Sequence, residues 1–508
     1  MTNSSTISSE VAHQRGMRIS KLSADELVRL SGAHADTDHL HAEDLMLINY
    51  AHVVMLVEQK IISMEEARPI LKTIQKLETL GWDKLIIRDP RVGDLTTQVE
   101  AYIIKETGEP VGGKMHTGRS RNDLNPTMDK MLIRREILEI YQALLTLEDS
   151  FLSLTASHID TIMPGYTHHS QQAQPITLGH FFLGNFDVFL RDIQRIEDFL
   201  PRLNICPMGA AALATTGFPL KRERVAELLG FQGIHEHSYD AVSAKDFLLE
   251  HLFILATVAS DMGRIAEDLL LWNTFEFGMI VLADEYTSFS SIMPQKKNPV
   301  AVETLRAYNS IISGKMFNAL GMLKGESWSN GRETTIMLDD AAGTGTKLRD
   351  MVYLLNGIVT TMEIKKGKMV DWARKGYSTA TELADTLVRE CGFSFRAAHE
   401  IVGLVVKNAI DSGLDSMQIT PAMVEEGIET HLGKKMKIAE EWVQNALDPE
   451  RNVQLRKLPG GPAFEEVKRM LNHRRQIFAE KKNSLQAIQD RISGAYDKLR
   501  KEVYEIIR

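Results

Sequence analysis

The sequence predicts an all-α protein built around a bundle of long helices. Apolar residues recur at the spacing of a helix face over several long stretches, and segments that alternate Val or Ile with polar residues are scarce. The chain has no run of strand–helix repeats, which argues against a doubly wound sheet. Long apolar-striped segments joined by Gly, Pro and polar connections are typical of helical bundles.

The expected helices follow one another along the chain. Their ranges are 41–64, 122–157, 175–199, 238–272 and 299–323. The fourth has Asp240 in its first turn and an apolar stripe that continues to Trp272, which predicts one helix of ~35 residues, about 50 Å long. Pro299 is suited to the first turn of the fifth. Several stripes are apolar over much of the helix circumference, so we expect a homo-oligomer, with a thick intramolecular bundle as the alternative.

The last stretch of the chain differs from the rest. After Gly460-Gly461-Pro462 it is rich in Lys, Arg and Glu, with apolar residues at helical spacing. This pattern predicts one or two amphipathic helices. A solvated appendage is the default interpretation, and a docking or oligomerisation element is the alternative.

Composition excludes several classes of protein. A chain of 508 residues predicts two or three domains. A net charge of −9 argues against a general nucleic-acid binder, so an anionic substrate would need a local cationic site. Cys206 and Cys391 are too few for a disulfide framework and indicate a reducing compartment. We find neither a signal peptide nor a transmembrane stretch, and we expect a cytoplasmic protein without membrane contact.

Motifs for common cofactors are missing from the sequence. Residues 343–347 (Gly-Thr-Gly-Thr-Lys) superficially resemble a phosphate loop but lack its Gly-Lys-Ser/Thr order. There is no His-Glu-x-x-His, nucleophile elbow or dinucleotide fingerprint. We therefore expect neither a metal nor an organic cofactor.

The most informative segment is Ser290–Pro299, with the sequence Ser-Ser-Ile-Met-Pro-Gln-Lys-Lys-Asn-Pro. Its hydroxyls, lysine pair and amide can hold a deprotonated serine or a carboxylate-derived dianion next to positive charge. The alternative is a polar connection whose side chains bond their own backbone. Glu303 follows in the next helix and is a candidate to orient an imidazole.

Two further polar clusters lie upstream. His116–Asp123 leads into a helix and offers Arg, Ser and Asn as a carboxylate receptor, with a decorated N-cap as the alternative. Pro164–Gln172 contains a His pair beside Thr and Gln, and His is suited to proton transfer near neutral pH. If such clusters meet, they do so at the ends of bundle helices, within one chain or across subunits. Together they suggest acid–base chemistry on an anionic substrate.

These blocks resemble the argininosuccinate lyase family of the fumarase/aspartase superfamily. The first is similar to the family's His-Thr-Gly-Arg-Ser-Arg-Asn-Asp, the second to Gly-Tyr-Thr-His, and the loop to the signature Ser-Ser-x-Met-Pro-x-Lys-x-Asn-Pro. Further similarity runs through 222–231 and 240–243, and the resemblance covers roughly residues 40 to 465.

The resemblance implies a three-domain chain in a homotetramer with a central twenty-helix bundle and active sites shared between subunits. The implied divisions are an N-terminal helical domain (1–118), a central bundle domain with the signature loop (119–365), a C-terminal helical domain (366–463) and an amphipathic helical extension (464–508). It also implies reversible anti β-elimination of a nitrogen leaving group from a small dicarboxylate, with release of fumarate.

The resemblance assigns roles to individual residues. Ser290 matches the catalytic base, and Lys296 and Asn298 match residues that stabilise the aci-carboxylate intermediate. His168, with Glu303, matches the pair that handles the proton at the leaving nitrogen. The positions expected to bind substrate are Ser120, Arg121, Asn122, Thr167, Met293, Asn49, Asn330 and Arg332.

The chain departs from the family pattern mainly at the leaving-group half of the site. Phe289 replaces the usual Gly, Thr96 replaces the His that follows Asp94, and Leu124 replaces a Gln. After Lys324-Gly325, an ungapped alignment puts Asn330, Thr335 and Leu338 where the family has Tyr, Gln and Lys that hold the amino-acid end of the substrate.

These departures leave the leaving group open. One hypothesis is an argininosuccinate lyase with a divergent pocket. The other is a lyase for an aminopolycarboxylate such as ethylenediamine-disuccinate or iminodisuccinate, in which Arg332 serves an extra carboxylate. A fumarase-like hydratase is more remote, because Gln295-Lys296-Lys297 and His116–Asp123 are of the lyase type. A catalytically silent structural paralogue is also more remote, because the full catalytic set is retained.

Overall fold

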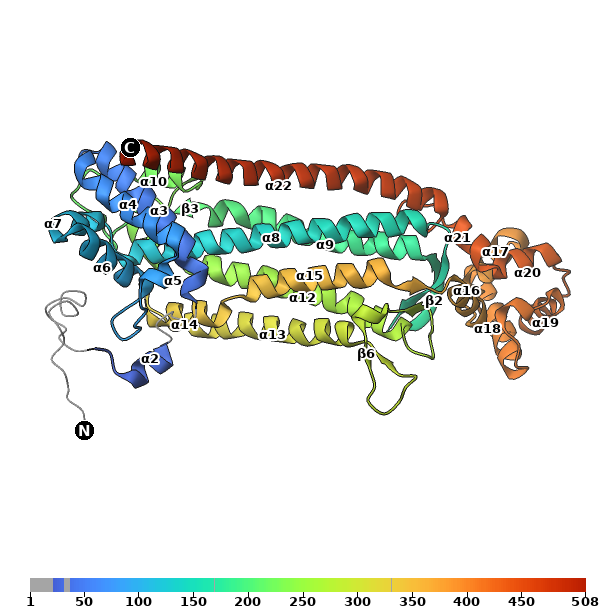
Figure 1. Cartoon of the computed structure of the whole chain (residues 1–508). Coiled ribbons are helices and arrows are strands. Elements are labelled where there is room, and N and C mark those ends of the chain that lie inside the picture. Colours follow the sequence, from blue (N-terminus) through green and yellow to red (C-terminus); the bar gives the residue numbers. More distant parts are fainter. Residues whose placement is uncertain (1–21, 32–36, 169, 330) are drawn as a thin grey trace.

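The computed structural model describes residues 22–31, 37–168, 170–329 and 331–508. Figure 1 shows an elongated molecule in which long helices run side by side, with smaller helical regions at the two ends. The predicted all-α class is confirmed, and the strands in these ranges pair only as short two-stranded ladders. None of the helices in the same ranges has the length and hydropathy that crossing a bilayer requires.

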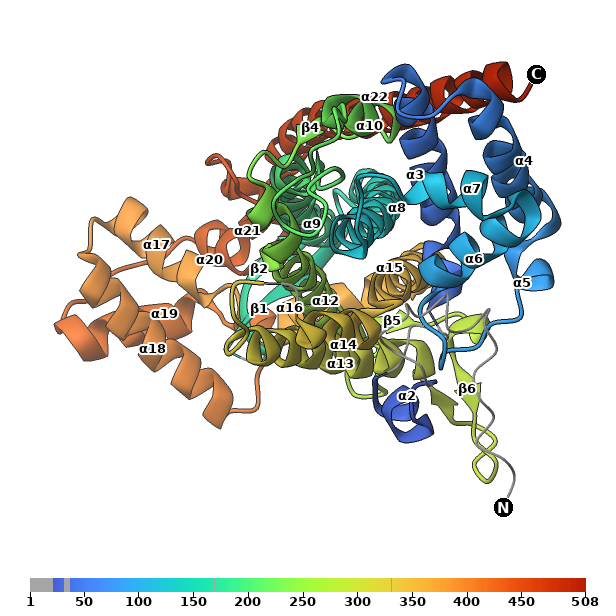
Figure 2. The same cartoon turned by 90° about the vertical axis from the view of Figure 1, so that its left-hand side faces the viewer.

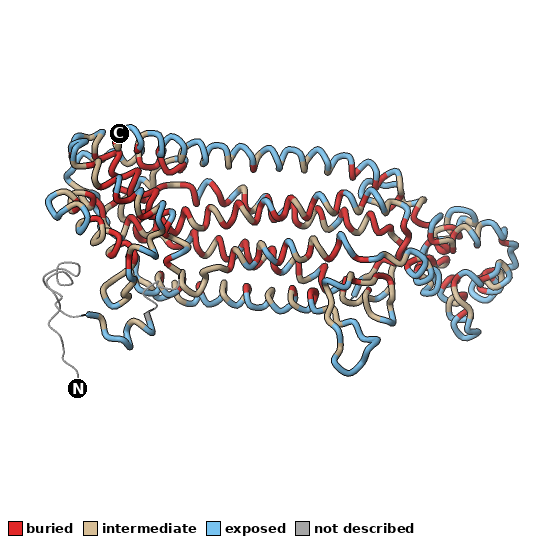
Figure 3. The backbone as a smooth tube through the Cα atoms, viewed as in Figure 1, coloured by how far each residue is buried: buried red, intermediate tan, exposed pale blue. Residues whose placement is uncertain are grey.

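Long helices form the central bundle and carry most of its apolar core. They are α8 (Arg121–Ser157), α9 (Leu178–Leu203), α12 (Asp246–Trp272), α13 (Val300–Leu323) and α15 (Thr344–Thr361). Phe151 of α8 stacks on Phe182 and Phe189 of α9, and all three rings are fully buried. Figure 3 shows the buried backbone concentrated between these helices, whereas α13 is exposed along much of its length.

Two predicted helix boundaries are wrong because local backbone signals override the apolar periodicity. The helix predicted over 41–64 is α3 (Asp38–Glu58), which ends before Lys60 takes a positive φ of 57°. Ser63 then caps the next helix through a reciprocal capping box. Pro175 lies in a strand, and α9 begins later, with the Thr177 side chain accepting the His180 N–H.

The segment 238–272 is two helices instead of one. α11 (Ser238–Ser243) and α12 are separated by Ala244 and Lys245. The apolar residues on the two sides of this break remain in phase, so periodicity alone cannot reveal it. Pro299 stands at the N-cap of α13, one position before the predicted first turn.

The N-terminal region surrounds α3 with shorter helices and has its own apolar core. These are α2 (Asp25–Ser31), α4 (Met64–Leu80), α5 (Trp82–Leu85), α6 (Leu95–Thr107), α7 (Glu109–Gly112) and the 3₁₀ helix η1 (Gly113–His116). This core extends to the start of α8 and to α10 (Arg222–Leu228). The loop that ends at Ser120 is therefore held between two packed regions.

Short ladders and helices lie at both ends of the bundle (Figure 1). The ladders pair β1 (Ile162–Thr167) with β2 (Gln171–Thr177), β3 (Ile205–Cys206) with β4 (Gly233–Ile234), β5 (Ile280–Val281) with β8 (Glu363–Ile364), and β6 (Ser288–Phe289) with β7 (Lys297–Asn298). The 3₁₀ helix η2 (Asp284–Tyr286) precedes β6, and α14 (Arg332–Ala341) connects α13 to α15. The C-terminal region contains α16 (Lys366–Lys375), α17 (Ala380–Cys391), α18 (Phe395–Asp411), η3 (Ser416–Gln418), α19 (Pro421–Leu432), α20 (Glu440–Leu447) and α21 (Pro449–Leu455).

The chain ends in one continuous helix, α22 (Phe464–Ile507), of 44 residues. It lies along the outside of the bundle and brings the C-terminus beside the N-terminal region (Figures 1 and 2). Its first half adds Val467 and Leu485 to the bundle core, and its end adds Leu499 and Val503 to the N-terminal core. The interpretation as a solvated appendage is therefore wrong, because α22 packs on both cores.

Candidate active site

The start of α8 presents a fixed set of backbone donors. Ser120 is the N-cap and its hydroxyl accepts the Asn122 N–H at 3.2 Å. Asp123 accepts the Ser120 N–H with one carboxylate oxygen (2.9 Å) and the Gly209 and Ala211 N–H groups with the other (2.9 and 2.8 Å). These bonds lock the loop to the helix, whose N-terminus favours anions.

A buried arginine lies directly behind this loop. Arg119 donates from Nη1 to Asn49 Oδ1 at 2.7 Å, and burial lowers the pKa of its guanidinium to about 10. Asn49 is only 1% exposed, so its side chain contacts Arg119 and does not line the open groove described below. The structure thus places this predicted substrate ligand one layer behind the surface.

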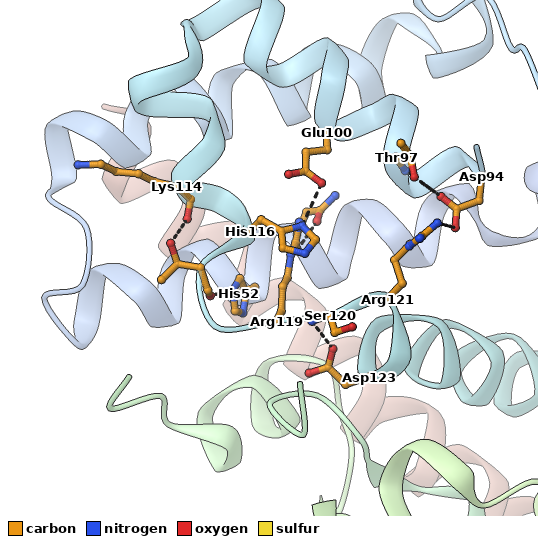
Figure 4. Close-up of polar contacts among 12 residues, drawn as sticks. His52, Asp94, Thr97, Glu100, Lys114, His116, Arg119, Ser120, Arg121 and Asp123 are labelled. Carbon is orange, nitrogen blue, oxygen red and sulfur yellow. Dashed lines mark hydrogen bonds and ion pairs between the residues drawn. The ribbon is translucent and has the colours of Figure 1, made fainter. Parts of the chain in front are cut away.

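Two histidines hold the same loop in place (Figure 4), and the sequence motifs do not mark either of them as a positioning group. His52 of α3 lies 3.0 Å from the Thr117 carbonyl, which only accepts, so Nε2 carries the proton and donates. His116 Nδ1 lies 2.9 Å from Glu100 Oε2. Burial tends to raise the pKa of Glu100, but His116 and the nearby arginines lower it overall. His52 could have been found only as a polar residue on an otherwise apolar helix face.

Arg121 and Asn122 face outward beside this fixed loop. Arg121 reaches Asp94 Oδ2 at 3.3 Å, and Asn122 donates to the Ala212 carbonyl at 3.0 Å. Asp94 caps α6 by accepting the Thr97 N–H and hydroxyl (2.9 and 2.7 Å). Burial opposes ionisation of Asp94, yet Arg121 and these bonds hold its pKa below its ordinary value. Figure 4 shows Arg121 and Asp94 pointing toward each other.

An open groove of 640 Å³ runs past these residues. Arg121 and Asn122 line it together with Arg332, the first residue of α14. The remaining wall comes from the N-terminal arm, the 90–94 loop and α14: Ser23, Leu27, Val28, Leu30, Pro90, Gly93, Asp94, Asn125, Thr335 and Ile336. The structure therefore brings three of the predicted substrate ligands together, while Asn330 lies outside the described residues.

The second cluster lies at the tip of the β1–β2 hairpin. Thr167 ends β1 and His168 follows it with a positive φ of 46°. Both side chains are exposed, and Ser170 also has a positive φ, of 67°. His169, the other member of the histidine pair, lies outside the described residues. His168 is therefore exposed on a strained turn.

The signature loop lies between β6 and β7. Ser290 Oγ accepts the backbone N–H groups of Met293 (3.1 Å) and Ile292 (3.4 Å). Two such donors stabilise negative charge on the hydroxyl oxygen. Met293 and Lys296 are exposed on the loop, Asn298 ends β7, and Glu303 is exposed in the first turn of α13.

The three clusters do not meet within one chain. The first lies at the start of α8 and the second follows its end, and 37 helical residues span roughly 55 Å. In Figure 1 the hairpins lie toward the opposite end of the bundle from the N-terminal region, and in Figure 2 β1 and β2 lie on a different side of the bundle from β6. A site that uses all three clusters needs more than one copy of the chain.

Comparison with known proteins matches this chain to lyases. A family described as "Lyase" matches residues 21–314, and one described as "Argininosuccinate lyase C-terminal" matches residues 377–454. Argininosuccinate lyase from Methanococcus maripaludis is 39% identical over 464 residues, covering 91% of this chain and 92% of the relative. The Methanosarcina mazei enzyme of the same name is 37% identical over 492 residues, covering 96% and 98%.

A solved structure supports the same placement. EDDS lyase in complex with formate superposes with a TM-score of 0.85 at 31% identity, covering 96% of both chains. The sequence likeness and the structural likeness both extend over nearly the whole length. By this likeness, the chain belongs to the argininosuccinate lyase family.

Proposed function

We propose that the chain is a carbon–nitrogen lyase that splits an N-substituted aspartate by anti β-elimination, releasing fumarate and an amine. Its argininosuccinate lyase relatives support argininosuccinate as the substrate and arginine as the amine. The observation that carries the proposal is the retention of all three polar clusters in a chain that resembles these enzymes over nearly its whole length.

In this reaction Ser290 removes the proton from the carbon next to a carboxylate. A serine hydroxyl is a weak acid, and lowering its pKa by one unit requires about 1.4 kcal/mol of selective stabilisation of the alkoxide. The Met293 and Ile292 N–H groups supply part of this stabilisation. Lys296 and Asn298 stabilise the dianionic intermediate as it forms.

The succinyl carboxylates bind at the start of α8. Ser120, Arg121 and Asn122 offer a hydroxyl, a guanidinium and an amide at a helix N-terminus, and Thr167 and Met293 complete the pocket from the two hairpins. Asn49 contributes through Arg119, which it holds behind the loop.

His168 handles the proton at the leaving nitrogen, with Glu303 as its partner. The exposure of His168 on its turn makes it available to a neighbouring chain, and the exposure of Glu303 at the start of α13 supports the same arrangement. Protonating the nitrogen converts a poor leaving group into a good one, so this pair acts when the carbon–nitrogen bond breaks.

We infer a homotetramer with shared active sites. The separation of the three clusters in one chain supports it, and so does the exposure of three large apolar side chains on α13: Ile311, Phe317 and Leu320. Several large apolar residues exposed on one helix are typical of a contact between subunits. Both cysteines are free thiols, which supports a cytoplasmic location.

A second candidate substrate is an aminopolycarboxylate. The likeness to EDDS lyase supports it, as does the position of Arg332 in the same groove as Arg121, where a further carboxylate would bind. The argininosuccinate lyase relatives are the stronger support, because their identity to this chain is higher.

The reverse reaction tests the proposal. The purified protein is incubated with fumarate and arginine, aspartate, ethylenediamine or ammonia, and adducts are identified by mass spectrometry. We expect an arginine adduct from the wild type and a loss of at least roughly a thousandfold in rate for Ser290→Ala, because the base is removed. Ser291→Ala, the adjacent exposed serine, is the matched control. An adduct with another amine alone would name a different leaving group, and unchanged elimination by Ser290→Ala would refute the base assignment.

A further inference from the structure

A small cavity continues inward from the substrate groove. It has a volume of 70 Å³ and shares Asp94, Asn125 and Thr335 with the groove. Lys245, in the break between α11 and α12, lines its inner part. Leu338 and Thr96, two positions at which the chain departs from the family pattern, line it as well.

Lys245 is a buried cation that lacks a direct partner. Lys245 is only 5% exposed, and within the described part of the chain its ammonium makes no hydrogen bond or ion pair. Asp129 and Glu326 attract it, but burial has the larger effect and lowers its pKa. An unpaired ammonium in a protein interior is costly, and a negatively charged ligand removes much of that cost.

Two of the three acidic groups that line the cavity are engaged elsewhere, and the third, Asp129, attracts the Lys245 ammonium. Asp38 forms an ion pair with Arg88, and Asp94 is held by Thr97 and Arg121. Glu326 accepts the Gly331 N–H at 2.9 Å. The side-chain oxygen of Asn125, by contrast, is buried and accepts no hydrogen bond in the described structure. The cavity therefore presents one available cation and one available acceptor.

The size of the cavity limits what can enter. A cavity of 70 Å³ holds a few water molecules, which is enough space for one carboxylate group. The rest of a ligand that reached Lys245 would lie in the groove beside Arg121 and Arg332.

We propose that Lys245 binds a carboxylate carried by the amine half of the substrate, so that the leaving group is an amino acid. This inference rests on the proposed function, in which the succinyl carboxylates already bind at the start of α8. A carboxylate at Lys245 is then an additional one, contributed by the leaving amine. An ammonium on the same amine would donate to the Asn125 oxygen.

The test compares each amine with its carboxylate-free counterpart. Addition to fumarate is measured for arginine against agmatine and for aspartate against ethylamine, with the full-length wild type and with Lys245→Met, which keeps the stem and removes the charge. For the carboxylate-bearing amine we expect KM to rise roughly 10- to 100-fold in the variant, as for loss of a charged hydrogen bond. KM for fumarate and the rate with the carboxylate-free amine stay unchanged.

Two further variants serve as controls. Lys245→Arg keeps the cation and therefore keeps the preference for the carboxylate-bearing amine. Lys324→Met, at an exposed lysine where α13 ends, leaves KM for both amines unchanged. Without substrate, Lys245→Met unfolds at the same or a higher temperature than the wild type, since it removes a buried unpaired charge.

Several results would overturn the inference. An equal loss for both amines of a pair, or no change in either, would show that Lys245 is not a carboxylate receptor. A Lys245→Met variant that fails to fold would contradict the premise that the Lys245 ammonium is unpaired in the native chain. A wild type that uses only carboxylate-free amines would refute this inference and leave the lyase proposal standing. A wild type that forms no adduct with any amine would refute both.

Discussion

At the scale of single residues, the loop that we propose binds the substrate carboxylates is held in place by buried side chains behind it. His52 is 1% exposed and holds the Thr117 carbonyl, while Asn49 holds Arg119 behind the same loop. Burial lowers the pKa of His52 from 6.5 to about 3, and the Arg119 charge adds to this effect. The native fold therefore requires a neutral imidazole at this position.

This requirement predicts a pH dependence of stability. Between pH 6.5 and 3 the unfolded chain binds a proton at His52 that the folded chain does not, so stability is lost as pH falls through this window. At pH 5 the loss is about 2 kcal/mol, at about 1.4 kcal/mol per pH unit. In His52→Gln, the amide group keeps an N–H donor near the position of the His52 Nε2 atom and does not titrate. Between pH 7 and pH 5, the free energy of unfolding of this variant should therefore fall by about 2 kcal/mol less than that of the wild type.

Denaturant unfolding at the two pH values checks this expectation. His39→Gln, at an exposed histidine of the same helix, is the matched control and should behave like the wild type. An identical pH dependence in the wild type and His52→Gln would contradict the assignment of His52 as a buried neutral base.

The sequence predicts the loop residues themselves but not their supports. Ser120, Arg121 and Asn122 stand in a contiguous motif, which a single sequence displays directly. His52, Asn49 and Glu100 reach the loop from other helices, and only the packing of α3 and α6 against the start of α8 brings them there. The sequence does not predict Lys245 either, because the apolar stripe runs in phase across the helix break that contains it.

At the scale of elements, α22 ties the N-terminal region to the bundle. Arg134 of α8 is 2% exposed and donates to Asn204 Oδ1 (2.7 Å), the Leu229 carbonyl (2.9 Å) and the Tyr496 hydroxyl of α22 (2.9 Å). Near the end of α22, Arg500 pairs with Glu78 of α4 at 2.7 Å. The helix thus completes the hydrogen bonding of a buried guanidinium that lies three to four turns after Ser120.

Removing this hydroxyl should destabilise the protein measurably. Tyr496→Phe leaves a buried Arg134 N–H with one acceptor fewer, which costs about 1–2 kcal/mol of unfolding free energy. Tyr504→Phe, at a residue of the same helix that is 62% exposed, should change stability by less than about 0.5 kcal/mol. Urea unfolding of both variants makes the comparison, and equal effects would mean that the buried contact does not stabilise the native chain.

The amphipathic pattern after Gly461 predicts a helix here but not its partners. Its charged residues read as a solvated face, whereas Arg474, Lys481 and Arg500 form ion pairs with residues 187, 197 and 78 of other helices. A charge pattern shows that a helix has a polar side; it does not show which other helix that side contacts.

At the scale of the whole molecule, the three clusters of the proposed site lie in regions that one chain keeps apart. Helical periodicity predicts the long bundle helices, and their lengths set the separation between the start of α8 and the hairpins. In an oligomer, the surfaces between chains decide which helix ends of different copies meet. No motif in a single sequence displays these contacts. The exposed apolar residues of α13 are the part of that information visible in one chain.

The most direct test of this account mixes two inactive variants. Asn122→Ala damages the first cluster and Ser290→Ala the third, and the two chains are co-expressed with different tags and purified as hybrids. If a site takes these clusters from different copies, random assembly restores roughly a quarter of wild-type activity, because some sites receive both intact clusters. Hybrids of Ser290→Ala with Lys296→Ala, both in the signature loop, should stay inactive. The predicted result is that activity returns only in hybrids of Asn122→Ala with Ser290→Ala. Activity in these hybrids no higher than that of the parent variants would contradict a site shared between chains.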